Sequence, residues 1–82
     1  MTPDDEWILN YMRTVPDDRR TCPDAALQYL TDNGIRYTEY EYQHMKTVIN
    51  RKMKIMEKYG MVRYTGRTVS ANIRSKIWEV VE

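Results

Sequence analysis

The 82-residue chain is predicted to fold as one α+β domain, with three helices followed by a two-stranded antiparallel hairpin. Hydrophobic residues recur at helical spacing in three segments that each begin with a capping signal. Two short segments rich in β-branched and aromatic residues follow near the C-terminus, after Gly60. A chain of this length has room for one hydrophobic core and for no large enclosed cavity, so residues 1–82 are expected to form a single domain.

The first helix is expected over residues 3–15. Thr2 suits the N-cap position, and Pro3 suits the first helical position, where its missing N–H is not needed. Hydrophobic side chains then recur at helical spacing until Pro16, which ends the pattern. These side chains are Trp7, Ile8, Tyr11, Met12 and Val15. A turn follows, and then a short extended segment over 19–21 that could pair with a strand elsewhere in the chain.

The second helix is expected to begin after Thr21 and to end at Gly34. Thr21 precedes Asp24 by three residues, which approximates the spacing of a capping box. Gly34 suits the left-handed conformation that ends many helices, and Ile35 supplies the hydrophobic contact behind it. The buried face of this helix is expected to comprise Ala26, Leu27 and Leu30.

The third helix is expected to run from a capping box at Thr38 and Glu41 to Tyr59, with Gly60 as its stop. At about 100° per residue the helix has two distinct faces. The expected core face comprises Tyr42, Met45, Ile49, Met53 and Met56. The opposite face comprises Tyr40, Gln43, Thr47, Asn50, Arg51, Lys54 and Lys58. We interpret the methionines as adaptable core side chains because they share one helical face.

The two strands are expected over residues 61–65 and 76–81. The connecting loop, 66–75, is rich in side chains that can donate hydrogen bonds to phosphate oxygens. These side chains are Arg67, Thr68, Ser70, Asn72 and Arg74. Val69 and Ile73 either extend the strands or pack against the domain, and the sequence leaves both alternatives open.

Charge is divided unevenly along the chain, although the net charge is only +1. Residues 1–42 carry a net charge of −5, residues 43–76 carry +8, and the last six residues carry −2. Such a division indicates contact with nucleic acid or a membrane by one part of the domain. The alternative is a solvated basic helix that pairs with acidic residues of the other half.

Composition argues against several other classes of protein. No apolar run approaches the roughly 20 residues that span a bilayer, and the acidic start is unlike a signal peptide, so we expect a cytoplasmic protein with no membrane partner. Cys22 and His44 are too few for a conventional zinc site, and no cofactor or metal is expected. The sequence contains neither the paired carboxylates nor the Gly-rich phosphate loop that would indicate an enzyme. A lone cysteine beside a helix start, such as Cys22, is more often structural than catalytic.

The predicted order of elements is that of a winged helix-turn-helix, in which the third helix enters the major groove of DNA and the hairpin is the wing. The segments DEWILNYM (5–12) and NRKMKIMEKYGMV (50–62) resemble the first and third helices of small archaeal winged-helix transcription regulators. Among such regulators, the chain resembles haloarchaeal phage-type repressors. The resemblance covers nearly the whole chain in element order. It implies sequence-specific binding of double-stranded DNA by a transcription regulator, and with no room for an effector domain we expect a repressor that acts by occlusion.

The resemblance also implies which residues contact DNA. Base edges would be approached by Tyr40, Gln43, His44 and Thr47, with Gln43 suited to adenine. The groove edge or phosphates would be contacted by Lys46, Asn50, Arg51 and Lys54. The wing would be anchored by Arg67, Arg74 and Lys76, and Arg36 would contact the backbone. If about five of these neutralise phosphates, log affinity should fall with log salt at a slope of about −4 to −5.

Several alternatives remain open for these residues. A winged helix could instead dock its basic face on an acidic protein partner, as a viral inhibitor of a host DNA-binding machine would. Each single charged residue could also be merely solvated, and His44 could be partly packed rather than beside DNA. Two DNA half-sites favour a homodimer, with Trp7, Tyr11 and the Val80-Val81 end as its symmetric contact.

Overall fold

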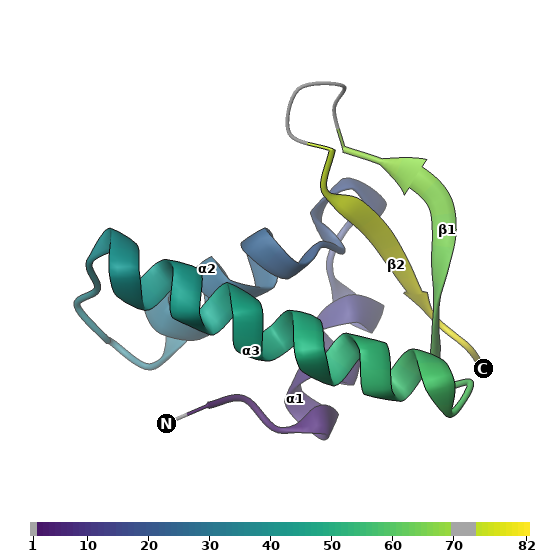
Figure 1. The fold of residues 1–82 in the computed structure, drawn as a ribbon, viewed down its shortest axis with the longest axis horizontal. Helices are drawn as coiled ribbons and strands as arrows, with labels where there is room; N and C mark the ends of the chain where they lie inside the picture. The colour runs from purple at the N-terminus through teal and green to yellow at the C-terminus, as the bar shows by residue number, and fades with distance from the viewer. Residues whose placement is uncertain (1, 70–73) are drawn as a thin grey trace.

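The computed structural model describes residues 2–69 and 74–82. Its elements are α1 (Asp5–Thr14), a 3₁₀ helix η1 (Asp17–Arg19), α2 (Cys22–Asp32), α3 (Glu39–Lys58), β1 (Val62–Thr68) and β2 (Lys76–Val80) (Figure 1). The three α-helices and the antiparallel hairpin that follows them confirm the predicted α+β, winged helix-turn-helix layout. No helix in the described ranges is long and apolar enough to cross a membrane.

Helix α1 begins later than the sequence predicts. Asp4, not Thr2, is the N-cap, and its carboxylate accepts a hydrogen bond from the Trp7 N–H at 2.8 Å. A carboxylate satisfies an otherwise unpaired N–H of the first turn and also interacts favourably with the helix dipole. The helix ends at Thr14 because Val15, which precedes Pro16, adopts an extended backbone (ψ 157°). The predicted turn after it is the 3₁₀ helix η1.

Helix α2 is capped as predicted, but its buried face differs. The Thr21 hydroxyl accepts the Asp24 N–H at 3.3 Å, and Gly34 adopts the left-handed conformation (φ +63°) beyond the helix end. Leu27 was expected in the core and is 37% exposed. The buried residues of α2 are Cys22, Ala25, Ala26, Tyr29 and Leu30. Their three- and four-residue spacing turns position 27 outward, so the prediction for Leu27 was wrong.

Helix α3 packs its methionine face into the core, as predicted. Met45, Ile49, Met53 and Met56 are buried, and Tyr42 is half-buried at the edge of this face. Thr38 caps the helix by accepting the Glu41 N–H at 3.4 Å. The helix ends where Gly60 adopts the left-handed conformation (φ +74°), a backbone geometry that side-chain-bearing residues rarely adopt. The 20-residue helix is about 30 Å long.

The hairpin has a longer first strand and a shorter connection than predicted. Tyr64 pairs with Trp78 and Thr68 pairs with Lys76, with an irregularity between these two pairs. Gly66, Arg67 and Thr68 therefore belong to β1, so the predicted loop boundary at residue 66 was wrong. The register extends beyond Thr68, because the Val69 N–H donates to the Ser75 carbonyl oxygen at 3.0 Å. Positions 70–73, which include the predicted contributions of Ser70, Asn72 and Ile73, lie outside the described residues.

The inner strand β2 packs on the helices and closes the core. Ile77 and Trp78 are buried, and Val62 of β1 joins them. The Trp78 N–H donates to the carbonyl oxygen of Arg20 at 2.9 Å, so the segment before α2 does contact a strand. The prediction that residues 19–21 are extended was wrong, because Arg19 ends η1 and Arg20 has ψ 59°. In Figure 1, α3 crosses the front of the molecule and the hairpin rises from its C-terminal end. The outer face of α3 is therefore left uncovered by the other elements.

Candidate nucleic-acid interface

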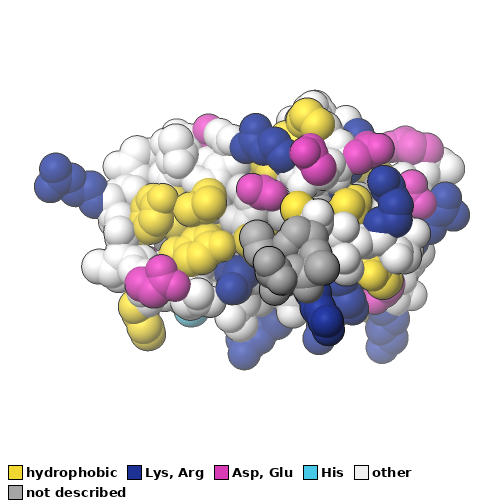
Figure 2. Space-filling view, turned by 90° about the horizontal axis from the view of Figure 1, so that it is seen from above, with side chains coloured by type: hydrophobic (Ala, Val, Ile, Leu, Met, Phe, Trp, Pro, Cys, Tyr) yellow, Lys and Arg dark blue, Asp and Glu magenta, His cyan; other side chains and the backbone are white. Residues whose placement is uncertain are grey.

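The outer face of α3 gathers half of the residues predicted to contact DNA. Because the opposite face is anchored in the core, helical periodicity directs these side chains to solvent. The exposed residues are Tyr40, which is 79% exposed, Gln43, His44, Thr47, Arg51 and Lys54. Figure 2 shows Lys and Arg side chains projecting from the lower edge of the molecule, whereas most Asp and Glu side chains lie in the upper half of the view. The two signs of charge are thus partly separated on this side of the molecule, although Lys and Arg side chains also lie in the upper half of the view.

Contacts along the helix orient the side chains at the start of this face. The Gln43 amide donates to Glu39 Oε1 at 2.8 Å, and the Thr47 hydroxyl donates to the Gln43 carbonyl oxygen at 3.0 Å. The rings of Tyr40 and His44 are nearly parallel, with centroids 6.5 Å apart. These are the four-residue spacings at which helical side chains meet. His44 is exposed rather than packed, at the rim of a surface pocket of about 220 Å³ that Leu30 also lines.

Two of the predicted residues, Lys46 and Asn50, lie half-buried on the side of α3 that faces the wing. They line a surface cavity of about 270 Å³ together with Lys76 of β2. The ammonium group of Lys46 lies 5.5 Å from the ring centroid of Tyr42, and that of Lys76 lies 5.2 Å from the ring centroid of Tyr64. The structure thus brings together one residue predicted for the helix and one predicted for the wing, 30 positions apart in the chain.

Cys22 forms part of the wall of the same cavity and is buried. Its thiol donates to Asn50 Oδ1 across 3.9 Å. Burial raises the pKa of the thiol from 9.0 to about 11, and the positive charges of Lys46 and Lys76 oppose this rise. The thiol is therefore protonated at neutral pH, which is the weakly nucleophilic form of cysteine.

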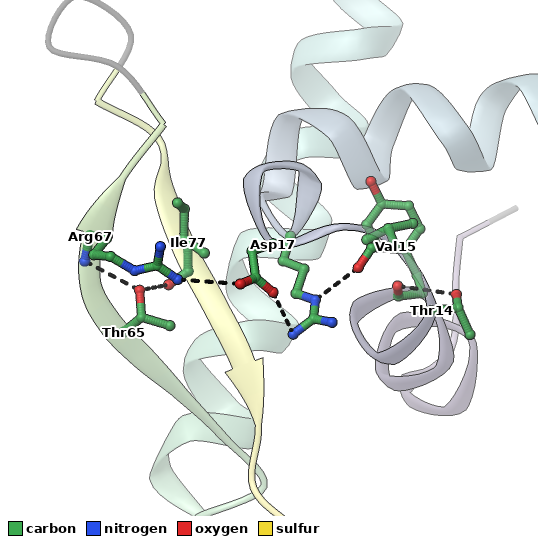
Figure 3. A network of polar contacts seen from close by, with 8 residues as sticks. Thr14, Val15, Asp17, Thr65, Arg67 and Ile77 are labelled. Carbon is green, nitrogen blue, oxygen red and sulfur yellow. Dashed lines mark hydrogen bonds and ion pairs between the residues drawn. The ribbon is translucent and has the colours of Figure 1, made fainter.

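Arg67, in contrast, is directed toward the N-terminal half of the molecule. Its guanidinium lies 3.7 Å from Asp17 of η1, and Asp17 also pairs with Arg20 at 3.2 Å (Figure 3). The Arg67 backbone N–H donates to the hydroxyl of Thr65, which in turn donates to the Ile77 carbonyl oxygen across the hairpin. The structure therefore does not bring Arg67 to the cavity beside α3. Both partners of the Arg67–Asp17 pair are more than half exposed, and such ion pairs exchange readily for other partners.

The two remaining predicted cations lie outside regular elements. Arg36 is exposed in the segment between α2 and α3. Arg74 is exposed immediately before β2 and has a left-handed backbone (φ +53°). Neither lies on the outer face of α3, so a DNA contact by either would come from a different part of the surface.

Some residues near the interface were not predicted to belong to it. Lys58 is exposed on α3, on the polar face found by periodicity, so the sequence already contained its signal. Ser75 and Trp78 line the cavity beside Lys76. Their place there depends on how the hairpin folds back over α3, which no local sequence pattern indicates. Lys52 is engaged elsewhere, at 3.9 Å from Asp5 of α1.

The expected homodimer contact is only partly available on the surface. Tyr11 is 5% exposed, and its hydroxyl donates to the Arg19 carbonyl oxygen at 2.8 Å, so it offers little surface to a partner. Trp7 and Val80 are half-buried, and Val81 is 44% exposed. A second copy would therefore contact chiefly the chain end rather than the Tyr11 ring.

No family model, curated protein or solved structure matches the chain. Function is therefore inferred from the fold, from the residues that the fold gathers on α3 and beside the wing, and from their chemistry. The resemblance to archaeal regulators remains an inference from the motif residues.

Proposed function

We propose that the protein binds double-stranded DNA in a sequence-specific manner, as a cytoplasmic transcription regulator that represses by occlusion. The observation that carries the proposal is the exposed, basic outer face of α3 within a winged-helix layout. The major groove of B-DNA is about 12 Å wide and admits an α-helix. With α3 in that groove, the wing would meet the adjacent backbone or minor groove.

The charges on this face are available to a ligand. Within residues 2–69 and 74–82, the ion pairs involve neither Arg51 nor Lys54, and Lys58 is likewise without one. Cations without a protein partner can release counterions from phosphates when DNA binds, which supplies most of the affinity for DNA of any sequence. The acidic N-terminal half would keep DNA from binding on the wrong side.

Polar side chains at the start of α3 would supply sequence preference. Gln43 presents an amide that pairs with adenine through one donor and one acceptor, once its contact with Glu39 is exchanged. Tyr40, His44 and Thr47 surround it on the exposed face. Base contacts of this kind specify the sequence, whereas the lysines and arginines position the protein.

A protein-interaction module, with the basic face on an acidic partner, is the second candidate function. Exposed hydrophobic residues at the C-terminal end of α3 favour it, because DNA backbone offers them no complementary surface. Ile55 is 56% exposed, Tyr59 is 73% exposed, and Met61 beyond the helix is 38% exposed. A viral inhibitor of a host DNA-binding protein would use such a mixed surface.

A mobility-shift titration with a random duplex pool at two salt concentrations distinguishes the two functions. DNA binding predicts a shift at low salt that weakens with added salt and with Arg51→Ala or Lys54→Ala. Arg13→Ala is the matched control, because it removes one positive charge from α1, where Arg13 pairs with Glu82 at 2.9 Å. Absence of a shift at low salt, or a shift indifferent to both α3 variants, would overturn the DNA proposal.

A further inference from the structure

The cavity between α3 and the wing has the composition of an anion site. Lys46, Thr47 and Asn50 line it from α3, Lys76 and Trp78 line it from β2, and Cys22 lines it from the start of α2. No Asp or Glu is found among the described residues of its wall. Its volume of about 270 Å³ compares with roughly 30 Å³ per water molecule in the liquid, so a phosphate group fits with several waters.

Both lysines bring uncompensated positive charge to this cavity. In the part of the chain that the structure describes, neither ammonium group forms an ion pair with a carboxylate. The ammonium group of Lys76 lies over the rings of both Tyr64 and Trp78, at 5.2 and 6.0 Å from their centroids. The ring contact holds the group in place without neutralising it, so its charge stays available to an anion.

The Cys22 thiol belongs to the same cavity wall as the two lysines. Burial is the main cause of its raised pKa, and Lys46 and Lys76 are the two charges that oppose the rise. Lys46 and Lys76 line the same cavity from α3 and from β2, so a ligand seated in it would lie beside both side chains. The Asn50 oxygen accepts the thiol hydrogen, which leaves the NH₂ group of Asn50 for another acceptor.

We propose that this cavity seats a single phosphate of the DNA backbone, held jointly by Lys46 and Lys76. The inference rests on the proposed function: with α3 in the major groove and the wing beside the next groove, the strand between the two grooves must pass between these elements. A backbone phosphate there meets one lysine from each side. Two lysines that contact one phosphate act as a unit, whereas the exposed cations of α3 act separately.

A double-mutant cycle tests this sharing. DNA affinity is measured between 50 and 200 mM salt for the wild type, Lys46→Met, Lys76→Met and the double variant, with thermal unfolding as a check on folding. Each single variant is expected to lose affinity on the order of tenfold. The salt slope should change little in either single variant, because the remaining lysine still neutralises the phosphate. The slope should fall by about 0.9 only in the double variant.

Lys54→Met provides the control. Lys54 lies eight residues from Lys46 on α3, about 12 Å along the helix, and it does not line the cavity. Its effect should add to that of Lys46→Met, because sites separated by more than about 7–10 Å with no shared partner are usually additive. If a methionine variant does not fold, the same cycle is run with Lys46→Gln and Lys76→Gln.

The outcomes separate this inference from the proposed function. If the wild type binds no duplex, the proposed function fails and this inference fails with it. If the wild type binds DNA but the two lysines contribute additively, with a slope that falls by about 1.8 in the double variant, they contact separate phosphates and the inference alone is wrong. DNA binding that is indifferent to both lysines, with inorganic phosphate bound by the wild type, would assign the cavity to a free anion and would also overturn it.

Discussion

The carbonyl oxygen of Arg20 accepts a hydrogen bond from the backbone N–H of Trp78 at 2.9 Å. This bond joins β2, the inner strand of the wing, to the segment between η1 and α2. The side chain of Arg20 continues the connection: its Nε donates to the Val15 carbonyl oxygen at 2.9 Å, and its guanidinium pairs with Asp17. One residue therefore connects the end of α1, the 3₁₀ helix and the hairpin. The wing is attached to the helices through this segment as well as through the core.

Removal of the Arg20 side chain should destabilise the domain. Arg20→Ala leaves the Val15 carbonyl oxygen without its partner and is expected to lower the free energy of unfolding by about 1–3 kcal/mol. Arg19→Ala is the matched control, because Arg19 is exposed and, among the described residues, the hydrogen bond of its guanidinium is a long one to Gln28, at 3.4 Å. Urea unfolding followed by circular dichroism gives both values. Equal losses for the two variants would contradict the structural role of Arg20.

The position of the first N-cap can be tested by two alanine substitutions. Asp4→Ala removes the carboxylate that accepts the Trp7 N–H and should lower the free energy of unfolding by about 1 kcal/mol. Thr2→Ala should change it by less than about 0.5 kcal/mol, because Thr2 is exposed and does not cap α1. Thermal unfolding of both variants checks the expectation. A larger loss of stability in Thr2→Ala than in Asp4→Ala would instead identify Thr2 as the N-cap.

Release of Arg67 from Asp17 should strengthen the proposed DNA binding. Asp17→Asn removes a negative charge and frees the Arg67 guanidinium to contact phosphate from the wing. We expect a severalfold gain in affinity at low salt and little change in stability, because exposed ion pairs contribute about 0–1 kcal/mol. Asp18→Asn makes the same change of charge at an exposed neighbour that does not pair with Arg67. A gain that persists in Asp17→Asn/Arg67→Ala would show that Arg67 is not its source.

Stability should fall in alkaline solution partly because of Cys22. Burial raises the pKa of its thiol from 9.0 to about 11 in the folded state. The folded protein therefore retains a proton that the unfolded chain loses between these values, and the free energy of unfolding decreases as pH rises from about 9 to 11. Burial likewise raises the pKa of Tyr11 to about 12, which extends the decrease to higher pH.

The contribution of Cys22 is isolated by comparison with Cys22→Ala. The variant is expected to have a shallower loss of stability between pH 9 and 11, measured by urea unfolding at each pH. Alkylation by iodoacetamide at pH 8 should also be slow in the folded wild type and fast after unfolding, because the thiolate is the reactive form. Rapid alkylation of the folded protein would contradict the burial of the thiol.

The elements of the fold that depend on local chemistry were predictable. The caps at Thr21 and Thr38 and the left-handed stop at Gly60 are set by a few neighbouring residues, and the structure confirms them. The choice between Thr2 and Asp4 was not predictable in this way, because both residues are good caps. The outward position of Leu27 depends on which stripe of α2 meets α3, and that is decided by packing between the helices.

The candidate interface likewise has features that were predictable from local sequence and features that were not. Periodicity alone placed Arg51 and Lys54 on an exposed face of α3, and the structure places them there. That Lys46 and Lys76 line one cavity could not be predicted from a local sequence pattern, because it depends on how the hairpin folds back over the helix. The engagement of Arg67 with Asp17 is likewise a contact between distant segments.

The irregular pairing between Tyr64 and Thr68 places residues 65–67 of β1 opposite Ile77 alone. At this point β1 therefore has more residues than the facing part of β2. Residues can be added or removed there without shifting Trp78 or Ile77 out of the core, since the inner strand keeps its own register. The reach of the wing can accordingly diverge between related proteins while the helices stay unchanged, and β1 is the position at which to engineer a longer or shorter wing.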